Sequence, residues 1–298
     1  MARILVTGAA GFIGRALCRT LAARGHAIVG AVRAVAGPVE GAELVALGEF
    51  TGRTDWTPVL AGTDIVIHLA QRAHRKGSFA GEPETATALA DAAARAGAGR
   101  LVYLSSIKAM GEATAPGRPF RAGDEPRPQD EYGSGKLATE QALATVPGIE
   151  LTVIRPPLVY GPGVGANFAA LMRLVASGLP LPFGGIDNRR SLVFVGNLAD
   201  LVATAALHPA AARKMLLVRD GVDLSTPALV RALASALGIR ARLFRLPGIG
   251  FAAPALTQRV QIDDAATRAL LGWTPPVSAE AGFAATAASF RAARALYR

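Results

Sequence analysis

Cysteine is nearly absent from this chain of 298 residues, in which Cys18 is the only one. One thiol cannot form an internal disulfide, nor a metal cage made of several cysteines. We therefore expect a protein of the cytoplasm, and we predict that it holds no metal ion.

Long hydrophobic runs are also missing, although 51% of the residues are apolar. No run reaches the roughly 20 residues that a membrane-spanning helix needs. The apolar stretch after Arg3 is broken by glycines that belong to a turn, so we predict no export signal and no membrane insertion. The length suits one large α/β domain, or one and a half.

Lysine is scarce as well. Of 32 basic residues only four are lysine, and the arginines that make up the rest are scattered along the chain. The net charge of +10 therefore lacks the basic runs interleaved with aromatic residues that are typical of nucleic-acid binding. We predict no nucleic-acid partner. The charge reflects either an arginine-rich composition or attraction of a polyanionic small molecule.

The most informative stretch is residues 3–33, which reads as a strand, a glycine-rich turn, a helix and a second strand. Gly8, Gly11 and Gly14 follow one another at every third position. Such spacing allows a tight turn, a close approach of the backbone to a ligand, and close packing of the helix on its strand. The free N–H groups at the start of that helix form a site for a pyrophosphate. The sequence therefore predicts a dinucleotide-binding unit.

The second strand of this unit, residues 27–32, ends where NAD-binding folds usually carry an acidic residue for the ribose hydroxyls. This chain has Val32 there, followed by Arg33. An arginine at this position can bind a 2′-phosphate, which favours NADP. The other interpretation is that Arg33 simply lies on the surface. We expect NAD or NADP as the cofactor, with a slight preference for NADP.

Two further strands, predicted at residues 64–70 and 100–105, bring polar groups to the carboxyl edge of the sheet, where open α/β sheets bind ligands. A polar loop, residues 71–81, follows the first. The second delivers Ser106. His68 lies inside the first, where a histidine is more often a satisfied core residue than a catalyst.

Tyr132 and Lys136 lie four positions apart at the start of a predicted helix, so both side chains share one face. A free tyrosine has a pKa of about 10, and a neighbouring ammonium would lower it toward the range in which the phenol exchanges a proton with a substrate hydroxyl. Ser106 would hold the same oxygen. We predict these three residues to be catalytic, with the hydride carried by the cofactor.

The chain resembles an extended short-chain dehydrogenase/reductase of the NAD-dependent epimerase/dehydratase family. The motifs that carry the resemblance are TGAAGFIG at residues 7–14, HLA at 68–70, LSS at 104–106, YGSGK at 132–136, RPPLVYGPG at 155–163 and RRSLVFVGNLAD at 189–200. The resemblance implies an α/β fold, a doubly wound parallel (Rossmann) sheet with a smaller, discontinuous C-terminal substrate-binding region. The expected bounds are 1–165, with 191–210 returning to it, for the Rossmann domain, and 166–190 with 211–298 for the substrate-binding region. Relatives often pair through the helix with Tyr-x-x-x-Lys, which leaves a homodimer open.

The resemblance also implies roles for single residues. The expected cofactor-binding residues are Gly8, Gly11, Phe12, Ile13 and Gly14 at the pyrophosphate, Glu49 and Phe50 by the adenine, Leu69 and Ala70 by the ribose, Pro156 and Pro157 near the nicotinamide, and Arg33, Tyr132 and Lys136. The expected substrate-binding residues are Ser106, Lys108, Asn167, Arg190 and Arg259, with a weaker match at Asp263. Asn167 and Arg190 match the positions that hold the diphosphate in nucleotide-sugar members, a role that suits the donor fork of arginine.

Two features narrow the expected activity on a UDP-sugar. Family dehydratases follow the serine with an Asp-Glu pair, whereas Ile107 and Lys108 follow Ser106 here, which disfavours dehydration. Residues 160–200 resemble bacterial enzymes of surface-polysaccharide synthesis, including reductases that make UDP-N-acetylquinovosamine. With Arg33, this favours a 4-ketoreductase of a UDP-6-deoxy-4-keto-HexNAc over a UDP-glucose or UDP-GlcNAc 4-epimerase that retains NAD. A reductase of a non-nucleotide ketone, or a catalytically silent regulator that binds a dinucleotide, would also fit these motifs.

Overall fold

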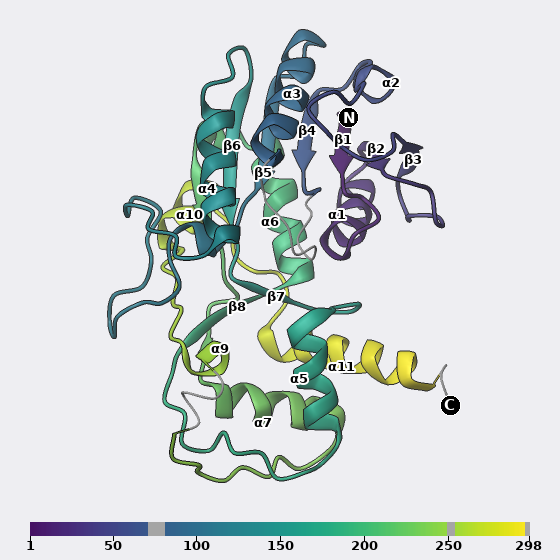
Figure 1. The fold of residues 1–298 in the computed structure, drawn as a ribbon. Coiled ribbons are helices and arrows are strands. Elements are labelled where there is room, and N and C mark those ends of the chain that lie inside the picture. The colour runs from purple at the N-terminus through teal and green to yellow at the C-terminus, as the bar shows by residue number, and fades with distance from the viewer. Residues whose placement is uncertain (71–80, 249–253, 296–298) are drawn as a thin grey trace.

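The computed structural model describes residues 1–70, 81–248 and 254–295, which form two regions, one above the other in Figure 1. The strands are β1 (Arg3–Thr7), β2 (Ala27–Val32), β3 (Glu43–Ala46), β4 (Ile65–His68), β5 (Arg100–Leu104), β6 (Glu150–Arg155), β7 (Leu158–Tyr160), β8 (Arg190–Phe194), β9 (Met215–Leu217) and β10 (Asp223–Leu224). The helices are α1 (Phe12–Ala23), α2 (Thr57–Leu60), α3 (Glu82–Arg95), α4 (Glu131–Ala144), α5 (Ala166–Ala176), α6 (Val195–Leu207), α7 (Thr226–Leu237), α9 (Pro254–Thr257), α10 (Ala265–Leu271) and α11 (Ala279–Ala295), with short 3₁₀ helices η1 (Ile107–Ala109) and η2 (Pro209–Ala211).

Seven strands form a parallel sheet in the order β3-β2-β1-β4-β5-β6-β9. The chain runs outward from β1 in one direction through β2 and β3, and in the other through β4, β5 and β6. The order therefore reverses between β1 and β4, and the crevice at such a reversal is where doubly wound sheets bind their ligands. The predicted α/β fold with a doubly wound parallel sheet is confirmed.

Alternating side chains of these strands build a separate apolar core on each face of the sheet. On one face, residues such as Ile4 and Ile67 pack with Leu17 of α1 and Leu198 of α6. On the other face, the neighbouring residues in sequence pack with α2, α3 and α4. Because both faces are covered, the strands are continuous apolar runs, as is typical of parallel sheets. No helix in the described parts of the chain is long and apolar enough to cross a membrane.

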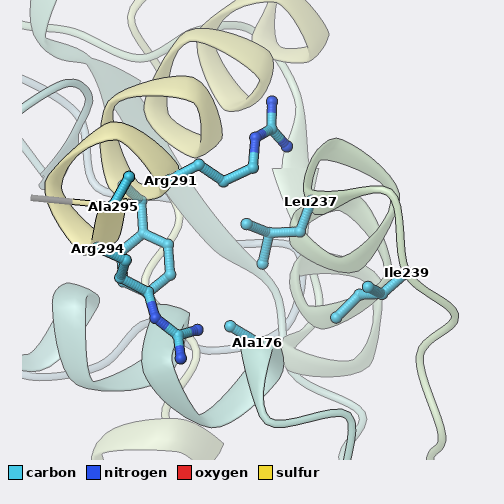
Figure 2. A pocket seen from close by; sticks show the side chains of 7 residues that line it. Ala176, Leu237, Ile239, Arg291, Arg294 and Ala295 are labelled. Carbon is cyan, nitrogen blue, oxygen red and sulfur yellow. The ribbon is translucent and has the colours of Figure 1, made fainter. Parts of the chain in front are cut away.

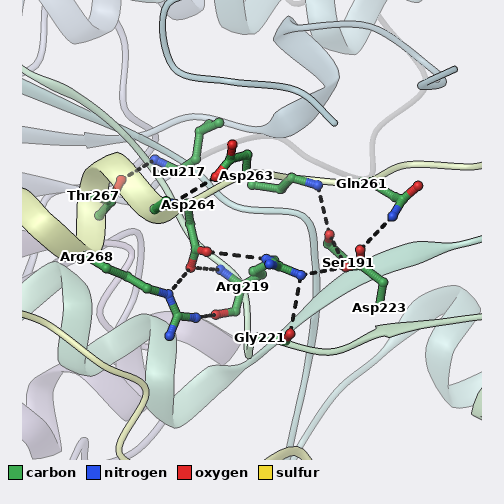
Figure 3. Close-up of polar contacts among 12 residues, drawn as sticks. Ser191, Leu217, Arg219, Gly221, Asp223, Gln261, Asp263, Asp264, Thr267 and Arg268 are labelled. Carbon is green, nitrogen blue, oxygen red and sulfur yellow. Dashed lines mark hydrogen bonds and ion pairs between the residues drawn. The ribbon is translucent and has the colours of Figure 1, made fainter. Parts of the chain in front are cut away.

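The smaller region contains a three-stranded sheet, β10-β8-β7, whose apolar side packs with α5, α7 and α11 (Figure 1). Polar contacts join its edge to the chain after β9 (Figure 3): Arg219 binds the carboxylates of Asp223 and Asp264, and Arg268 binds Asp264. Asp223 also accepts from Ser191 of β8 at 2.6 Å. These contacts tie the C-terminal segments to the strand that begins with Arg190.

The path of the chain between the two sheets differs in detail from the expected division. The strand β9 pairs with β6 in the large sheet, although it lies after residue 211. The strands β7 and β8 pair with each other in the small sheet, while α6 packs on α1 in the large region. The chain therefore crosses between the regions more often than its motifs suggest.

A cavity of about 280 Å³ lies in the smaller region among α5, α7 and α11. Figure 2 shows Leu237 and Ile239 on one side of it and Arg291 and Arg294 on the other. Arg291 donates to the carbonyl oxygen of Ala236 at 2.9 Å. The cavity contains none of the residues that the sequence singles out for cofactor or substrate.

Candidate active site

The glycine turn between β1 and α1 lies against the end of β4 and leaves no room for side chains. Gly8 has a φ of +71°, in the left-handed region, and a Cβ built on it would lie 3.0 Å from the Ala70 nitrogen. A Cβ on Gly14 would lie 2.2 Å from the Gly8 carbonyl oxygen, which is closer than such atoms can approach. Glycine is therefore required for the turn to pack on β4 and for α1 to pack on the turn.

The first turn of α1 offers its backbone N–H groups without a competing side chain. Gly11 is the N-terminal cap, and among the described residues no side chain accepts a capping hydrogen bond from these groups. No acidic residue lies in this turn, which begins with Phe12 and Ile13. The positive end of the helix therefore faces the glycine turn, where any side chain larger than hydrogen would occupy the space beside the N–H groups. This arrangement fits the pyrophosphate of a dinucleotide.

Arg33 and Glu49 meet just beyond the ends of β2 and β3. The Arg33 Nη1 lies 3.3 Å from the Glu49 Oε1, and the two side chains are 69% and 53% exposed. Phe50 packs beside them on the Trp56 ring, with 5.0 Å between the ring centroids. Arg33 thus lies just after β2 with a carboxylate partner, which would compete with a 2′-phosphate for its guanidinium.

The chain just after β4 is held by the last residue of β1. The backbone N–H groups of Leu69 and Ala70 both donate to the Thr7 Oγ1, each at 3.2 Å. Thr7 Oγ1 also lies 2.8 Å from the His68 Nδ1. The predicted ribose-side residues are therefore fixed against the glycine turn. The loop that follows, residues 71–80, lies outside the described residues.

Ser106, just after β5, and Tyr132, at the start of α4, are brought together. The Ser106 Oγ caps η1 by accepting from the Lys108 N–H at 3.2 Å. Tyr132 lies in the first turn of α4, whose cap, Asp130, accepts from the Gly133 N–H at 2.6 Å. The side chains of Ser106 and Tyr132 hydrogen-bond each other. Two of the three predicted catalytic groups are thus in direct contact.

The start of α4 approaches η1 so closely that position 133 has to be glycine. A Cβ on Gly133 would lie 2.4 Å from the Lys108 carbonyl oxygen and 2.9 Å from its carbonyl carbon. Backbone atoms cannot turn aside as the end of a side chain can, so a larger residue would push the helix away. Gly133 therefore allows the close packing of α4, which carries Tyr132, on η1, which Ser106 caps.

Burial raises the pKa of Tyr132 above its usual value. The hydrogen bond with Ser106 lowers this pKa, while the carboxylates of Glu82 and Asp130 raise it further. The prediction that a neighbouring ammonium lowers the pKa is therefore wrong for this arrangement, since burial outweighs the other causes. Tyr132 is a phenol at neutral pH and can donate its proton.

Lys136 lies one helical turn after Tyr132 and directs its ammonium toward the sheet. Its Nζ donates to the Leu104 carbonyl oxygen at 2.6 Å and to the Tyr103 hydroxyl at 3.1 Å, and it stands 4.5 Å from the centroid of the Tyr103 ring. Lys136 is 2% exposed. Burial lowers the pKa of Lys136 to about 7, while Glu82 and Glu140 act in the opposite direction. The sequence identified Lys136 but missed its partner Tyr103.

A buried ion pair, which the sequence analysis also missed, fixes α4 to the strands that carry the site. Arg155, the last residue of β6, donates its Nε to the Glu140 Oε1 at 2.9 Å and also binds Oε2. Ser105 donates its hydroxyl to the same carboxylate. A glutamate one turn after Lys136 is the signal that could have pointed to it. The Pro156 carbonyl oxygen then accepts from the Ile107 N–H at 2.9 Å, and Pro157 is also buried.

The predicted substrate-binding residues have different surroundings. Lys108 binds the carboxylates of Glu112 and Asp130. Asn167 is exposed in the first turn of α5. Arg190 is the first residue of β8, and burial lowers its pKa.

The two residues with the most distant match also have partners within the protein. Arg259 donates to the Gln261 side chain at 3.2 Å and to the Asp187 carbonyl oxygen at 3.4 Å. Asp263 binds Arg121, with 3.2 Å between Nε and Oδ2. Any contact of these two residues with a ligand would have to share or replace these bonds.

Known proteins resemble the chain in sequence and in fold. The model of the NAD dependent epimerase/dehydratase family matches residues 4–217. The UDP-glucose 4-epimerase of Vibrio cholerae is 41% identical in an alignment that covers 96% of this chain and 95% of that protein. The UDP-glucose 4-epimerase of Mycolicibacterium smegmatis is 32% identical, covering 97% and 98%.

Solved structures agree on the fold. The UDP-N-acetylglucosamine 4-epimerase from Bacillus cereus has a TM-score of 0.80 at 20% identity, and the match covers 99% of this chain and 100% of that one. The Thermus thermophilus UDP-glucose 4-epimerase in complex with NAD has a TM-score of 0.77 at 24% identity, covering 98% and 99%. With the sequence matches over nearly the whole length, this establishes that the chain belongs to the NAD-dependent epimerase/dehydratase family and is an extended short-chain dehydrogenase/reductase that uses NAD.

Proposed function

We propose that this enzyme is a UDP-sugar 4-epimerase, which oxidises the sugar at C4 and reduces the resulting ketone again on a cofactor that it retains. The observation that carries the proposal is the 41% identity, over 96% of the chain, to the UDP-glucose 4-epimerase of Vibrio cholerae. The contact between Ser106 and Tyr132 supplies the proton-transfer groups that such a reaction needs. This conclusion puts epimerisation ahead of the ketone reduction that the motifs favoured.

In this role Tyr132 takes the proton from the C4 hydroxyl as the phenolate during oxidation and returns it as the phenol during reduction. Because burial raises its pKa, the phenolate has to be stabilised by nearby positive charge, for which Lys136, one helical turn away, is the nearest ammonium on the same helix face. Ser106 hydrogen-bonds the same sugar oxygen and keeps it within reach of the phenol. When bound, NAD would supply the hydride acceptor for the oxidation at C4 and the hydride donor for the reduction. Gly8, Gly11 and Gly14 would hold its pyrophosphate, since their cradle excludes side chains.

For the substrate we propose that Arg190 and Asn167 hold the diphosphate of UDP. A guanidinium stays charged even when burial lowers its pKa, so Arg190 can carry this contact from a largely buried position. Arg259 is proposed to lie by the uridine. Lys108 already has two carboxylate partners, so its contact with a sugar would have to replace one of these ion pairs.

Reduction of a UDP-linked 4-keto sugar with NADPH is the second candidate. Arg33 favours it, because an exposed guanidinium just after β2 suits a 2′-phosphate. Glu49, 3.3 Å away, opposes it by competing for the same guanidinium. The two activities use the same Ser106 and Tyr132 and differ in whether the cofactor is exchanged.

The test is to incubate the purified protein with UDP-glucose and UDP-GlcNAc and to follow the C4 epimers by NMR, while mass spectrometry identifies the nucleotide that survives gel filtration. We expect interconversion without added cofactor and a retained NAD. Tyr132→Phe should lower the rate by about 10²-fold or more, whereas the control Tyr160→Phe, also a buried tyrosine, should retain it. Loss of NADPH absorbance with a UDP-4-keto-6-deoxy sugar, without epimerisation, would establish the reductase instead.

A further inference from the structure

Thr7, His68 and Tyr103 form a row across three neighbouring strands of the large sheet. They are direct partners in register, with Thr7 opposite His68 and His68 opposite Tyr103. All three lie on the face covered by α3 and α4, and none is more than 4% exposed. The row therefore runs from the glycine turn to the ammonium of Lys136, which donates to the Tyr103 hydroxyl.

The hydrogen bonds fix where the protons of this row lie. The Thr7 Oγ1 already accepts from the N–H groups of Leu69 and Ala70, so its own proton is directed at the His68 Nδ1, 2.8 Å away. This assigns the tautomer of His68 with its proton on Nε2. The imidazole is thereby held flat beside the Tyr103 ring, with 5.9 Å between centroids and 21° between the planes.

The Tyr103 hydroxyl is fixed by two neighbours at its other end. An ammonium can only donate, so the phenol oxygen accepts from Lys136. The Tyr103 hydroxyl also hydrogen-bonds Thr139, whose Oγ1 donates to the Gly135 carbonyl oxygen at 2.8 Å. Thr139 is therefore the second side chain at the phenol oxygen, about one turn of α4 beyond Lys136.

We propose that Tyr103, oriented by His68 and Thr7, is a positioning residue that fixes the Lys136 ammonium and stabilises its charged form. Two of the three ammonium donors are held, one by Tyr103 and one by the Leu104 carbonyl oxygen. The row is neutral over the physiological range, because burial lowers the pKa of His68 to about 3 and raises that of Tyr103 well above its usual value. A charged His68 would repel the ammonium.

The other charged groups around Lys136 come from the helices. Glu82 at the start of α3 and Glu140 in α4 both raise its pKa, while burial lowers it, and the balance lies at about 7. The next ionisable group on the same helix face is Tyr132, which burial keeps protonated. Tyr103 differs from these groups because it is uncharged and accepts a hydrogen bond directly from the ammonium. Its contribution to the pKa of Lys136 can therefore be measured by removing a single oxygen atom.

The test measures the titration of Lys136 in the full-length protein labelled with [ε-¹³C]lysine. The chain has only Lys76, Lys108, Lys136 and Lys214, so the spectrum contains few signals, and Lys136→Arg assigns the one of interest. We expect a midpoint of about 7 in the unmodified protein. Tyr103→Phe removes an acceptor from a charged, buried donor and should lower the midpoint by about one pH unit.

Two variants make the result decisive. Tyr160→Phe removes another buried tyrosine hydroxyl, one that is bonded to Asp220, and should leave the Lys136 midpoint unchanged. Thr139→Val keeps the Tyr103 ring but removes the second partner of its hydroxyl, and should lower the midpoint by less than Tyr103→Phe. A midpoint that neither Tyr103→Phe nor Thr139→Val moves, or that Tyr160→Phe moves equally, overturns the proposal. Its meaning for catalysis rests on the proposed function, but the measurement needs neither substrate nor cofactor.

Discussion

The buried pair of Arg155 and Glu140 should couple strongly in stability. The two residues are 1% and 6% exposed, so removing either one leaves an uncompensated charge in the interior. We expect Arg155→Met alone, or Glu140→Leu alone, to lower the free energy of unfolding by about 3–5 kcal/mol. The double variant removes both charges and leaves the Ser105 hydroxyl without its carboxylate, which should cost only about 1–3 kcal/mol.

Urea unfolding of the four proteins, followed by far-UV circular dichroism, measures the cycle. The double variant should be more stable than either single variant, so the coupling energy would amount to several kcal/mol, well above the ~0.5 kcal/mol at which distant sites add. A double variant that loses the sum of the single losses would refute the reasoning, because it would mean that the two side chains contribute independently. Single losses below about 1 kcal/mol, the range of exposed pairs, would refute the claim that the pair is desolvated.

Three further changes test other parts of the site. Gly14→Ala places a Cβ 2.2 Å from the Gly8 carbonyl oxygen and should weaken NAD binding by ~10- to 100-fold, as measured by calorimetry. The control is Gly99→Ala, whose Cβ would have no atom within 4 Å and should leave the affinity unchanged. Equal affinity of the two variants would contradict the reasoning. The pKa of His68 is about 6.5 in the unfolded chain, and burial lowers it to about 3 in the folded protein. The neutral imidazole therefore contributes fully to the free energy of unfolding above pH 6.5, and this contribution is lost as the pH falls, by about 2 kcal/mol at pH 5. His68→Asn should flatten the dependence of urea unfolding on pH, and an unchanged dependence would count against a buried neutral imidazole. Glu49→Gln removes the carboxylate partner of Arg33 and should shift the ratio of NADP affinity to NAD affinity toward NADP by about 2- to 5-fold, which is the range of an exposed ion pair. A shift toward NAD would argue that Arg33 does not face the 2′ position of the adenine ribose.

Local patterns in the sequence were enough for the regular elements of the large sheet. The strand at Ala27–Val32 has the bounds that the sequence predicts, and the strands predicted at 64–70 and 100–105 contain Ile65–His68 and Arg100–Leu104. An alanine-rich run also predicts a helix at 84–97, and this helix begins earlier in the structure, at Glu82, because Pro83 is acceptable in a first turn. The sequence predicts a last helix at 279–297, whose end lies outside the described residues.

Short elements and the crossings between regions could not be predicted in the same way. The strand β7 is three residues long and follows two prolines, so its sequence reads as a turn, and only its pairing with β8 makes it a strand. The strand β10 has two residues and is likewise defined by β8. Such elements depend on partners far away in the chain, which a local pattern does not contain.

In the site, the sequence identified the residues whose motifs are local, and it missed those that act through burial. Ser106, Tyr132 and Lys136 were found from spacing, but the sign of the pKa shift of Tyr132 depends on how deeply it is buried. Tyr103 reads as an ordinary residue of an apolar strand, and its contact with Lys136 follows from the way α4 packs on β5. Spacing along a helix cannot supply that information.

Because position 133 has no side chain, the distance between the Tyr132 phenol and the Ser106 hydroxyl is sensitive to a single substitution there. Since a methyl group there would press on the Lys108 carbonyl oxygen, it would separate the phenol from the serine without altering either of them. Such a protein would keep its core and its glycine turn, yet the phenol and the serine hydroxyl would no longer meet. A single added carbon atom could thus turn a working catalyst into a folded protein that only binds.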